Sequence, residues 1–118
     1  MALDIGHWAL RGYGRWAVIE KQSCEMVGSC GLWWPAGYPR SELTSWIISS
    51  ARRKGYAKEA SIAAIQYGYN DLGWSIVETH IKDDNHAARH LVESLGGTVI
   101  ARETFPDGLE RNICKLPQ

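Results

Sequence analysis

Short apolar segments bounded by turn residues follow one another along most of the chain. At residues 16–19 the side chains alternate in type, which is typical of a strand with one buried face. We expect strands at residues 16–21, 26–34, 42–48, 75–81, 98–104 and 109–116. Residues 22–25 predict a turn between the first two strands. Pro106-Asp107-Gly108 predicts a tight hairpin between the last two.

Two other segments have the period of a helix. From Tyr56 to Leu72, small side chains recur on one face and bulky ones beside them, which suits close packing on a sheet. The small ones are Ala57, Ala60, Ala64 and Gly68. A second helix is expected to begin after Asn85 as its capping residue and to end at Gly96-Gly97. Residues 1–14 are interpreted as the tail of a helix followed by a loop.

The expected order is therefore strand-strand-strand-helix-strand-helix-strand-strand, with no repeat and no linker. We predict one domain over residues 1–118 with an α/β (α+β) fold. Its sheet is mixed and mostly antiparallel, flanked by helices. The strand-helix-strand unit in the middle implies that segments 42–48 and 75–81 run parallel.

Composition narrows the possible partners. Of the 118 residues, 45% are hydrophobic and 22% charged, which favours a folded chain. The formal net charge is +0, and the basic residues are scattered apart from Arg52–Lys54, which argues against nucleic acid. The three cysteines show no metal spacing, so we expect free thiols in a cytoplasmic protein. We see no signal peptide and no apolar run of about 20 residues, and therefore expect no membrane partner.

The segment Arg52–Ala57 is the most informative in the chain. It joins an expected strand to an expected helix through a turn that contains Gly55. Backbone N–H groups at a helix start are unpaired, and the helix dipole adds positive charge there, so this place favours a phosphate or diphosphate. Arg52, Arg53 and Lys54 reinforce that preference. Taken alone, these cations favour a solvated basic turn, and the diphosphate interpretation gains from the motifs around them.

Arg52, Gly55 and Ala57 match an acyl-CoA motif of Gln or Arg, two free positions, Gly, one free position, and Gly or Ala. Together with the strand before it, the Asn85-led helix and the closing hairpin, this turn resembles the GNAT superfamily of acyl-CoA-dependent N-acetyltransferases. Residues 55–60 are similar to the branch that acetylates ribosomal-protein N-termini. The resemblance runs from about Arg15 to the C-terminus.

The resemblance implies acetyl-CoA as co-substrate, no metal, and a central parallel pair of strands that splay apart. It implies that backbone groups of Arg53–Ala57, including Tyr56, cradle the diphosphate, and that the pantetheine arm pairs near Ile47 and Ile48. A backbone N–H near Ile48 would stabilise the oxyanion. Asn85 would add a contact to its role as a cap. Glu42 would act as the base for direct attack by a primary amine, the acceptor being a protein N-terminus or a small molecule.

The sequence also departs from its relatives. Val92 stands where many of them carry a tyrosine, and Ala88 where the ribosomal-protein branch often has a serine. The resemblance implies that a first strand and helix are lacking before Trp16. A homodimer that completes the cleft is one expectation. A non-catalytic acyl-CoA-binding or interaction module is the alternative function.

Several residues keep two interpretations at this stage. Glu42 is either the base or an ordinary strand residue. His80 either points into the cleft or, as we favour, lies on the sheet surface. Trp33 and Trp34 belong either to the core, as we favour, or to the acceptor side of the site.

Overall fold

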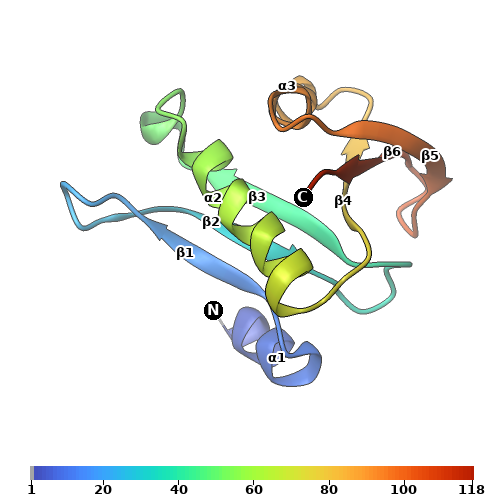
Figure 1. The fold of residues 1–118 in the computed structure, drawn as a ribbon, viewed down its shortest axis with the longest axis horizontal. Helices are drawn as coiled ribbons and strands as arrows, with labels where there is room; N and C mark the ends of the chain where they lie inside the picture. The colour runs from blue at the N-terminus through green and yellow to red at the C-terminus, as the bar shows by residue number, and fades with distance from the viewer. Residues whose placement is uncertain (1) are drawn as a thin grey trace.

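The computed structural model describes residues 2–118, with side chains from residue 5 onward. Three α-helices and six strands follow the predicted order, with a helix in front. They are α1 (Ala2–Arg11), β1 (Arg15–Ile19), β2 (Met26–Trp33), β3 (Glu42–Ile47), α2 (Tyr56–Gln66), β4 (Val77–Lys82), α3 (His86–Ser94), β5 (Thr98–Thr104) and β6 (Glu110–Leu116). Figure 1 shows α2 lying across the face of β1, β2 and β3. No helix among residues 2–118 is long and apolar enough to cross a membrane.

The strands form two antiparallel sheets of three, in the orders β1-β2-β3 and β4-β6-β5. β3 and β4 meet in the middle, where the Thr79 hydroxyl donates to the Leu43 carbonyl at 2.9 Å. The two strands start close together and diverge toward their ends (Figure 1). They belong to separate hydrogen-bonded sheets. The predicted fold class, a mixed, mostly antiparallel arrangement with a splayed central pair, is confirmed.

The small-residue face of α2 packs against the sheets as predicted. A Cβ added at Gly68 would lie 2.7 Å from Cγ2 of Val77 and 3.3 Å from Cδ1 of Leu32, so only glycine fits there. Ala64 and Ile65 of α2 belong to the same buried core as these two neighbours. At the other end of α2, Tyr56 and Ala57 pack against the smaller buried cluster of Val27, Ile47 and Ala51, which fixes where the N-terminus of the helix lies.

The prediction of one regular helix from Tyr56 to Leu72 is wrong at its C-terminal end. The α-helix stops at Gln66, and Tyr67–Asp71 form a π-helical turn. The Leu72 N–H donates to the Tyr67 carbonyl, five residues back, at 3.0 Å. The wider turn brings Gly68 against Val77, and a period of 3.6 residues cannot reveal such a change.

Tyr69, within this turn, joins the end of α2 to β4 and β6 of the second sheet. Its hydroxyl donates to the Leu116 carbonyl and accepts from the Val77 N–H at 3.1 Å. We expect Tyr69→Phe to destabilise the protein by about 1–3 kcal/mol, because a buried donor and a buried acceptor lose their partner. Urea denaturation would measure the loss. The control is Tyr67→Phe, whose hydroxyl makes no hydrogen bond within the described residues. Equal midpoints for both variants would contradict the prediction.

A buried histidine holds α1 against the first sheet. His7 Nδ1 lies 2.8 Å from the Tyr13 carbonyl, and Nε2 accepts from the Trp34 N–H at 2.8 Å. The His7 ring also stacks on Trp33, with 4.5 Å between ring centroids. These contacts place α1 beside the end of β2, next to the start of β3.

Candidate active site

The loop between β3 and α2 has the geometry of an anion cradle. Gly55 caps α2 with a positive φ of 81°, and no side chain caps the helix. Arg53 is also left-handed, with φ 66°. The Arg52 Nε donates to the Ile47 carbonyl at 3.0 Å and so holds the loop against the end of β3. The first N–H groups of α2 are therefore without a side-chain acceptor, beside three exposed cations.

The β1–β2 hairpin supports this loop. The Tyr56 hydroxyl donates to the Glu20 carboxylate at 2.6 Å, and Lys54 Nζ lies 3.6 Å from the same oxygen. The hydrogen bond from Tyr56, with smaller contributions from other groups, holds the pKa of Glu20 below its ordinary value. The carboxylate fixes Tyr56 and Lys54 at the start of α2.

The backbone of β3 alternates between two neighbours. The Ile48 N–H donates to the Val27 carbonyl at 2.8 Å, so this amide is already paired. Since hydrogen-bonded pairs alternate along an antiparallel ladder, the backbone groups of Leu43, Ser45 and Ile47 point away from β2. Of the two residues predicted to meet the pantetheine arm, Ile47 has its amide directed toward the gap between β3 and β4.

Glu42 lies at the narrow end of that gap. Its side chain is 19% exposed, and its Oε2 accepts from the His80 backbone N–H at 3.2 Å. Burial raises the pKa of Glu42 from 4.5 to about 7, while the bond from His80 and the charge of Arg111 oppose that rise. A carboxyl group that titrates near neutral pH can both accept and release a proton, as a general base requires.

His80 is buried against this carboxylate, so its interpretation as a sheet-surface residue is wrong. Its side chain is 1% exposed, because the Phe105 ring packs against it and two carboxylates, Glu42 and Glu78, lie beside its two ring nitrogens. The Nε2 atom lies 3.0 Å from Glu78 Oε1, and Nδ1 lies 3.5 Å from Glu42 Oε2. Arg40 Nε lies 3.3 Å from the same Glu78 oxygen, and Arg40 Nη2 lies 3.0 Å from Glu103 Oε1.

The β5–β6 hairpin predicted from Pro106-Asp107-Gly108 closes the site. The Phe105 and His80 ring centroids are 5.0 Å apart. Arg111 lies over the Phe105 ring and forms two hydrogen bonds with Asp107, at 3.0 and 2.7 Å. The same arginine lowers the pKa of Asp107. These contacts exclude water from one side of His80.

Asn85 occupies the capping position predicted for it. Its Oδ1 accepts from the Ala88 N–H at 3.1 Å and so begins α3. Val92 is buried in the core, where a tyrosine of many relatives would stand. All three cysteines are free, as predicted.

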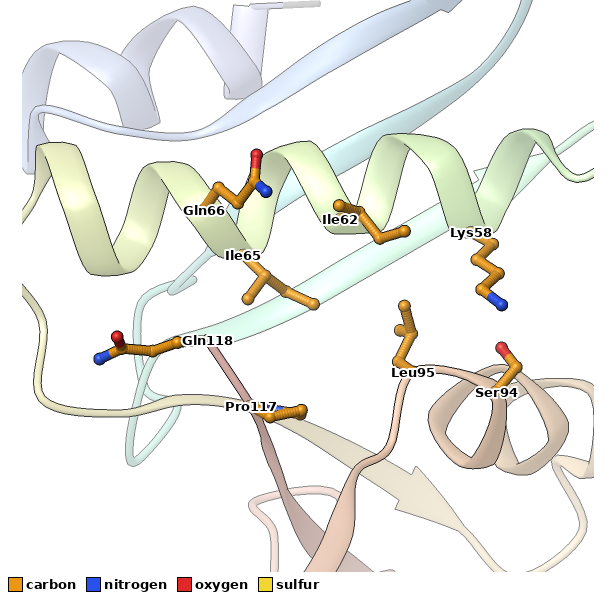
Figure 2. A pocket seen from close by; sticks show the side chains of 8 residues that line it. All are labelled: Lys58, Ile62, Ile65, Gln66, Ser94, Leu95, Pro117 and Gln118. Atoms are coloured by element: carbon orange, nitrogen blue, oxygen red, sulfur yellow. The ribbon is translucent and has the colours of Figure 1, made fainter.

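A cavity of about 210 Å³ lies between α2 and α3, and its lining on α2 begins at Lys58, in the first turn after Gly55, and extends to Gln66. Figure 2 shows Ile62 and Leu95 pointing toward each other across it, with Lys58 and Ser94 at one end. A second cavity of about 300 Å³ lies between β1 and α2 and is lined by Trp16, Val18 and several alanines. Only the first adjoins the anion cradle.

The residues that sequence reasoning missed are Glu78, Arg40 and Glu103. Glu78 and His80 are two positions apart on β4 and therefore point to one face, a pattern visible in the sequence. Nothing in the sequence indicated that this face is buried, or that Arg40 and Glu103 come from distant segments to meet it. Trp33 lies opposite Glu42 in the β2–β3 register and so borders the site, whereas Trp34 packs against the core.

Comparison with known proteins identifies the class. Residues 2–98 match the family model described as acetyltransferase (GNAT) domain, so the chain belongs to the GNAT acetyltransferase family. The uncharacterised protein YkkB of Bacillus subtilis strain 168 is 30% identical over 91 residues, which are 73% of this chain and 52% of YkkB. The chain thus spans about half the length of this curated relative.

Solved structures share the fold. An acetyltransferase of Agrobacterium tumefaciens strain C58 superposes with a TM-score of 0.88 over 99% of this chain and 68% of its own, at 20% identity. A chimera of spermidine N-acetyltransferase SpeG from Vibrio cholerae and hSSAT superposes with a TM-score of 0.73. The match covers 95% of this chain and 69% of the chimera, at 19% identity. Identities this low establish the fold alone. The ribosomal-protein branch stays a prediction.

Proposed function

We propose that this protein transfers an acetyl group from acetyl-CoA to a primary amine by direct attack, without a covalent enzyme intermediate. One observation carries the proposal. A single gap between β3 and β4 has an uncapped helix start at its wide end and a carboxyl group that titrates near pH 7 at its narrow end. Such a gap suits a ligand with a diphosphate at one end and a reacting group at the other.

The wide end would bind the diphosphate. The N–H groups from Arg53 to Ala57 would donate to its oxygens, and Arg52 and Lys54 would supply charge. The pantetheine arm would follow β3 and pair with the Ile47 amide. The cavity between α2 and α3 would take up the part of the coenzyme that lies between the two helices. Asn85, at the start of α3, would add the coenzyme contact that the resemblance implies.

The narrow end would carry out the chemistry. Glu42 would remove a proton from the ammonium form of the acceptor, because only the neutral amine is a nucleophile. Attack on the thioester creates an oxyanion. The Ile48 amide expected to stabilise it is already paired with Val27, so a backbone N–H of β3 that faces the gap nearer Glu42, that of Ser45, would take this role. The leaving thiol has a pKa of only about 8.5, so it departs with little assistance. No metal takes part in this scheme.

The acceptor would be a cation. Glu42, Glu78 and Glu103 gather at the narrow end with Arg40 among them, and carboxylates attract an ammonium group. The predicted classes are a protein N-terminus and a small-molecule amine. The second includes polyamines, since the spermidine N-acetyltransferase named above shares this fold.

Calorimetric titration with acetyl-CoA and with CoA tests the proposal, with the molecular mass measured alongside by light scattering. We expect dissociation constants of about 1–100 μM, in the range of ordinary enzyme substrates. The exposed Trp16 and the apolar cavity at β1 suit a homodimer, so the mass should be twice that of the chain. Absence of binding to folded protein would refute the coenzyme site, and a monomer at micromolar concentration would refute the dimer.

A further inference from the structure

The chemistry proposed above makes a demand that Glu42 alone does not meet. An acceptor that arrives as an ammonium ion must lose two protons before it becomes an amide. The first leaves before attack, and the second leaves the nitrogen of the tetrahedral intermediate. A single carboxylate holds one proton at a time, so a second acceptor beside Glu42 would free it for the second step.

The imidazole of His80 has the geometry of that second acceptor. Its Nε2 is 3.0 Å from Glu78 Oε1, and a carboxylate there requires a proton on Nε2. In the neutral ring, Nδ1 is then a bare acceptor. It is buried and has no hydrogen-bond donor among the described residues, and Glu42 Oε2 is 3.5 Å away. Two acceptors face each other, an arrangement that a proton on Glu42 converts into a hydrogen bond.

Neighbouring groups set the proton affinity of this imidazole. Glu42 on β3, Glu78 on β4 and Glu103 on β5 contribute negative charge, and Arg40 opposes them with positive charge. Burial outweighs these charges and lowers the pKa of His80, so the resting ring is neutral and able to accept. Glu78 then stabilises the imidazolium that forms, as a carboxylate does for a catalytic histidine elsewhere.

We propose that His80 is a positioning residue that receives at Nδ1 the proton Glu42 removes from the acceptor ammonium, with Glu78 fixing its tautomer. This inference rests on the proposed function. The ammonium N–H bond breaks and a Glu42 O–H bond forms. That O–H bond breaks as Nδ1–H forms, which returns Glu42 to its carboxylate. Glu42 takes the second proton after attack and passes it to the departing thiolate. The buried imidazolium then returns its proton to Glu42, whose partly exposed carboxylate releases it to water.

The first test observes the imidazole nitrogens by nitrogen-15 NMR and needs no turnover. In the wild-type protein we expect the proton on Nε2 and an Nδ1 resonance that moves as Glu42 titrates near pH 7. In Glu42→Gln that movement should disappear, while the spectrum of the exposed His90, the internal control, should be the same in both proteins. A proton fixed on Nδ1, or an Nδ1 resonance indifferent to Glu42→Gln, would overturn the proposal.

The second test is kinetic, with acetyl-CoA and spermidine as the probe acceptor. We expect His80→Ala to lower kcat about 10- to 100-fold, with an unchanged KM for acetyl-CoA, and added imidazole to restore much of the loss. His90→Ala is the matched control. A folded His80→Ala protein at full rate, or one that imidazole does not rescue, would count against the relay. If the space left by the missing imidazole prevents His80→Ala from folding, His80→Gln takes its place as the test variant. The rate of His80→Gln should likewise fall.

The two tests separate this inference from the function on which it rests. If the wild-type protein showed no acetyl transfer to amines, the proposed function would be refuted. The NMR measurement would still decide whether Glu42 and His80 exchange a proton. Coupled titration with a normal rate in His80→Ala would refute the role of His80 and leave the proposed acetyl transfer intact.

Discussion

Replacing Gly55 by glutamate is expected to lower the affinity for CoA about a thousandfold. Gly55 begins α2, and a Cβ added there meets no other atom within 4 Å, so a side chain would extend into the space assigned to the diphosphate. Two like charges about 4 Å apart near a protein surface repel by about 4 kcal/mol, which corresponds to about three orders of magnitude in affinity. Calorimetric titration with CoA at constant ionic strength measures the change.

The control for charge is Gly55→Gln, which has the same length without the carboxylate. Both variants place a side chain at φ 81°, so both carry the same backbone strain. We expect Gly55→Gln to lose no more than about tenfold in affinity. Equal losses in the two variants would mean that shape alone disfavours the ligand. Wild-type affinity in Gly55→Glu would place the diphosphate elsewhere.

Replacing Glu42 by glutamine is expected to lower kcat/KM by about 10²- to 10⁴-fold, the usual contribution of a general base. In the wild-type protein the rate should rise with pH through about 7, because only the ionised carboxylate accepts a proton. That limb should vanish in Glu42→Gln, and CoA affinity should stay near normal. Release of CoA thiol across a pH series measures the rate and its dependence on pH, and calorimetric titration measures the affinity for CoA. An unchanged rate would remove Glu42 from the mechanism.

The same substitution should change how stability depends on pH. The pKa of Glu42 is raised from 4.5 to about 7, so the folded protein holds this proton more tightly than the unfolded chain does. The resulting stabilisation is complete below about pH 4.5 and is lost as pH rises through about 7, with a total change of about 3 kcal/mol. Urea midpoints at acidic and basic pH should show this slope in the wild type and a flatter one in Glu42→Gln.

Much of the fold follows from local patterns. The turn residues and the capping Asn85 mark where elements begin and end, since backbone geometry at those positions is decided by the residue itself. The anion cradle at Arg52–Ala57 is also local, because a strand, a glycine turn and a helix start lie within one short segment. The exception is the π-helical turn after Gln66, which depends on contact with β4.

The narrow end of the gap, to which we assign the chemistry, is decided by tertiary structure. By itself, the sequence determined the order of the elements, the cradle and the family resemblance, all of which rest on residues close together in the chain. Only the folded chain brings Glu42, Glu78, His80 and the hairpin residue Phe105 together and covers them. Burial, not residue type, raises the pKa of Glu42 and leaves His80 Nδ1 without a donor. Burial depends on contacts between distant segments, which no local pattern contains.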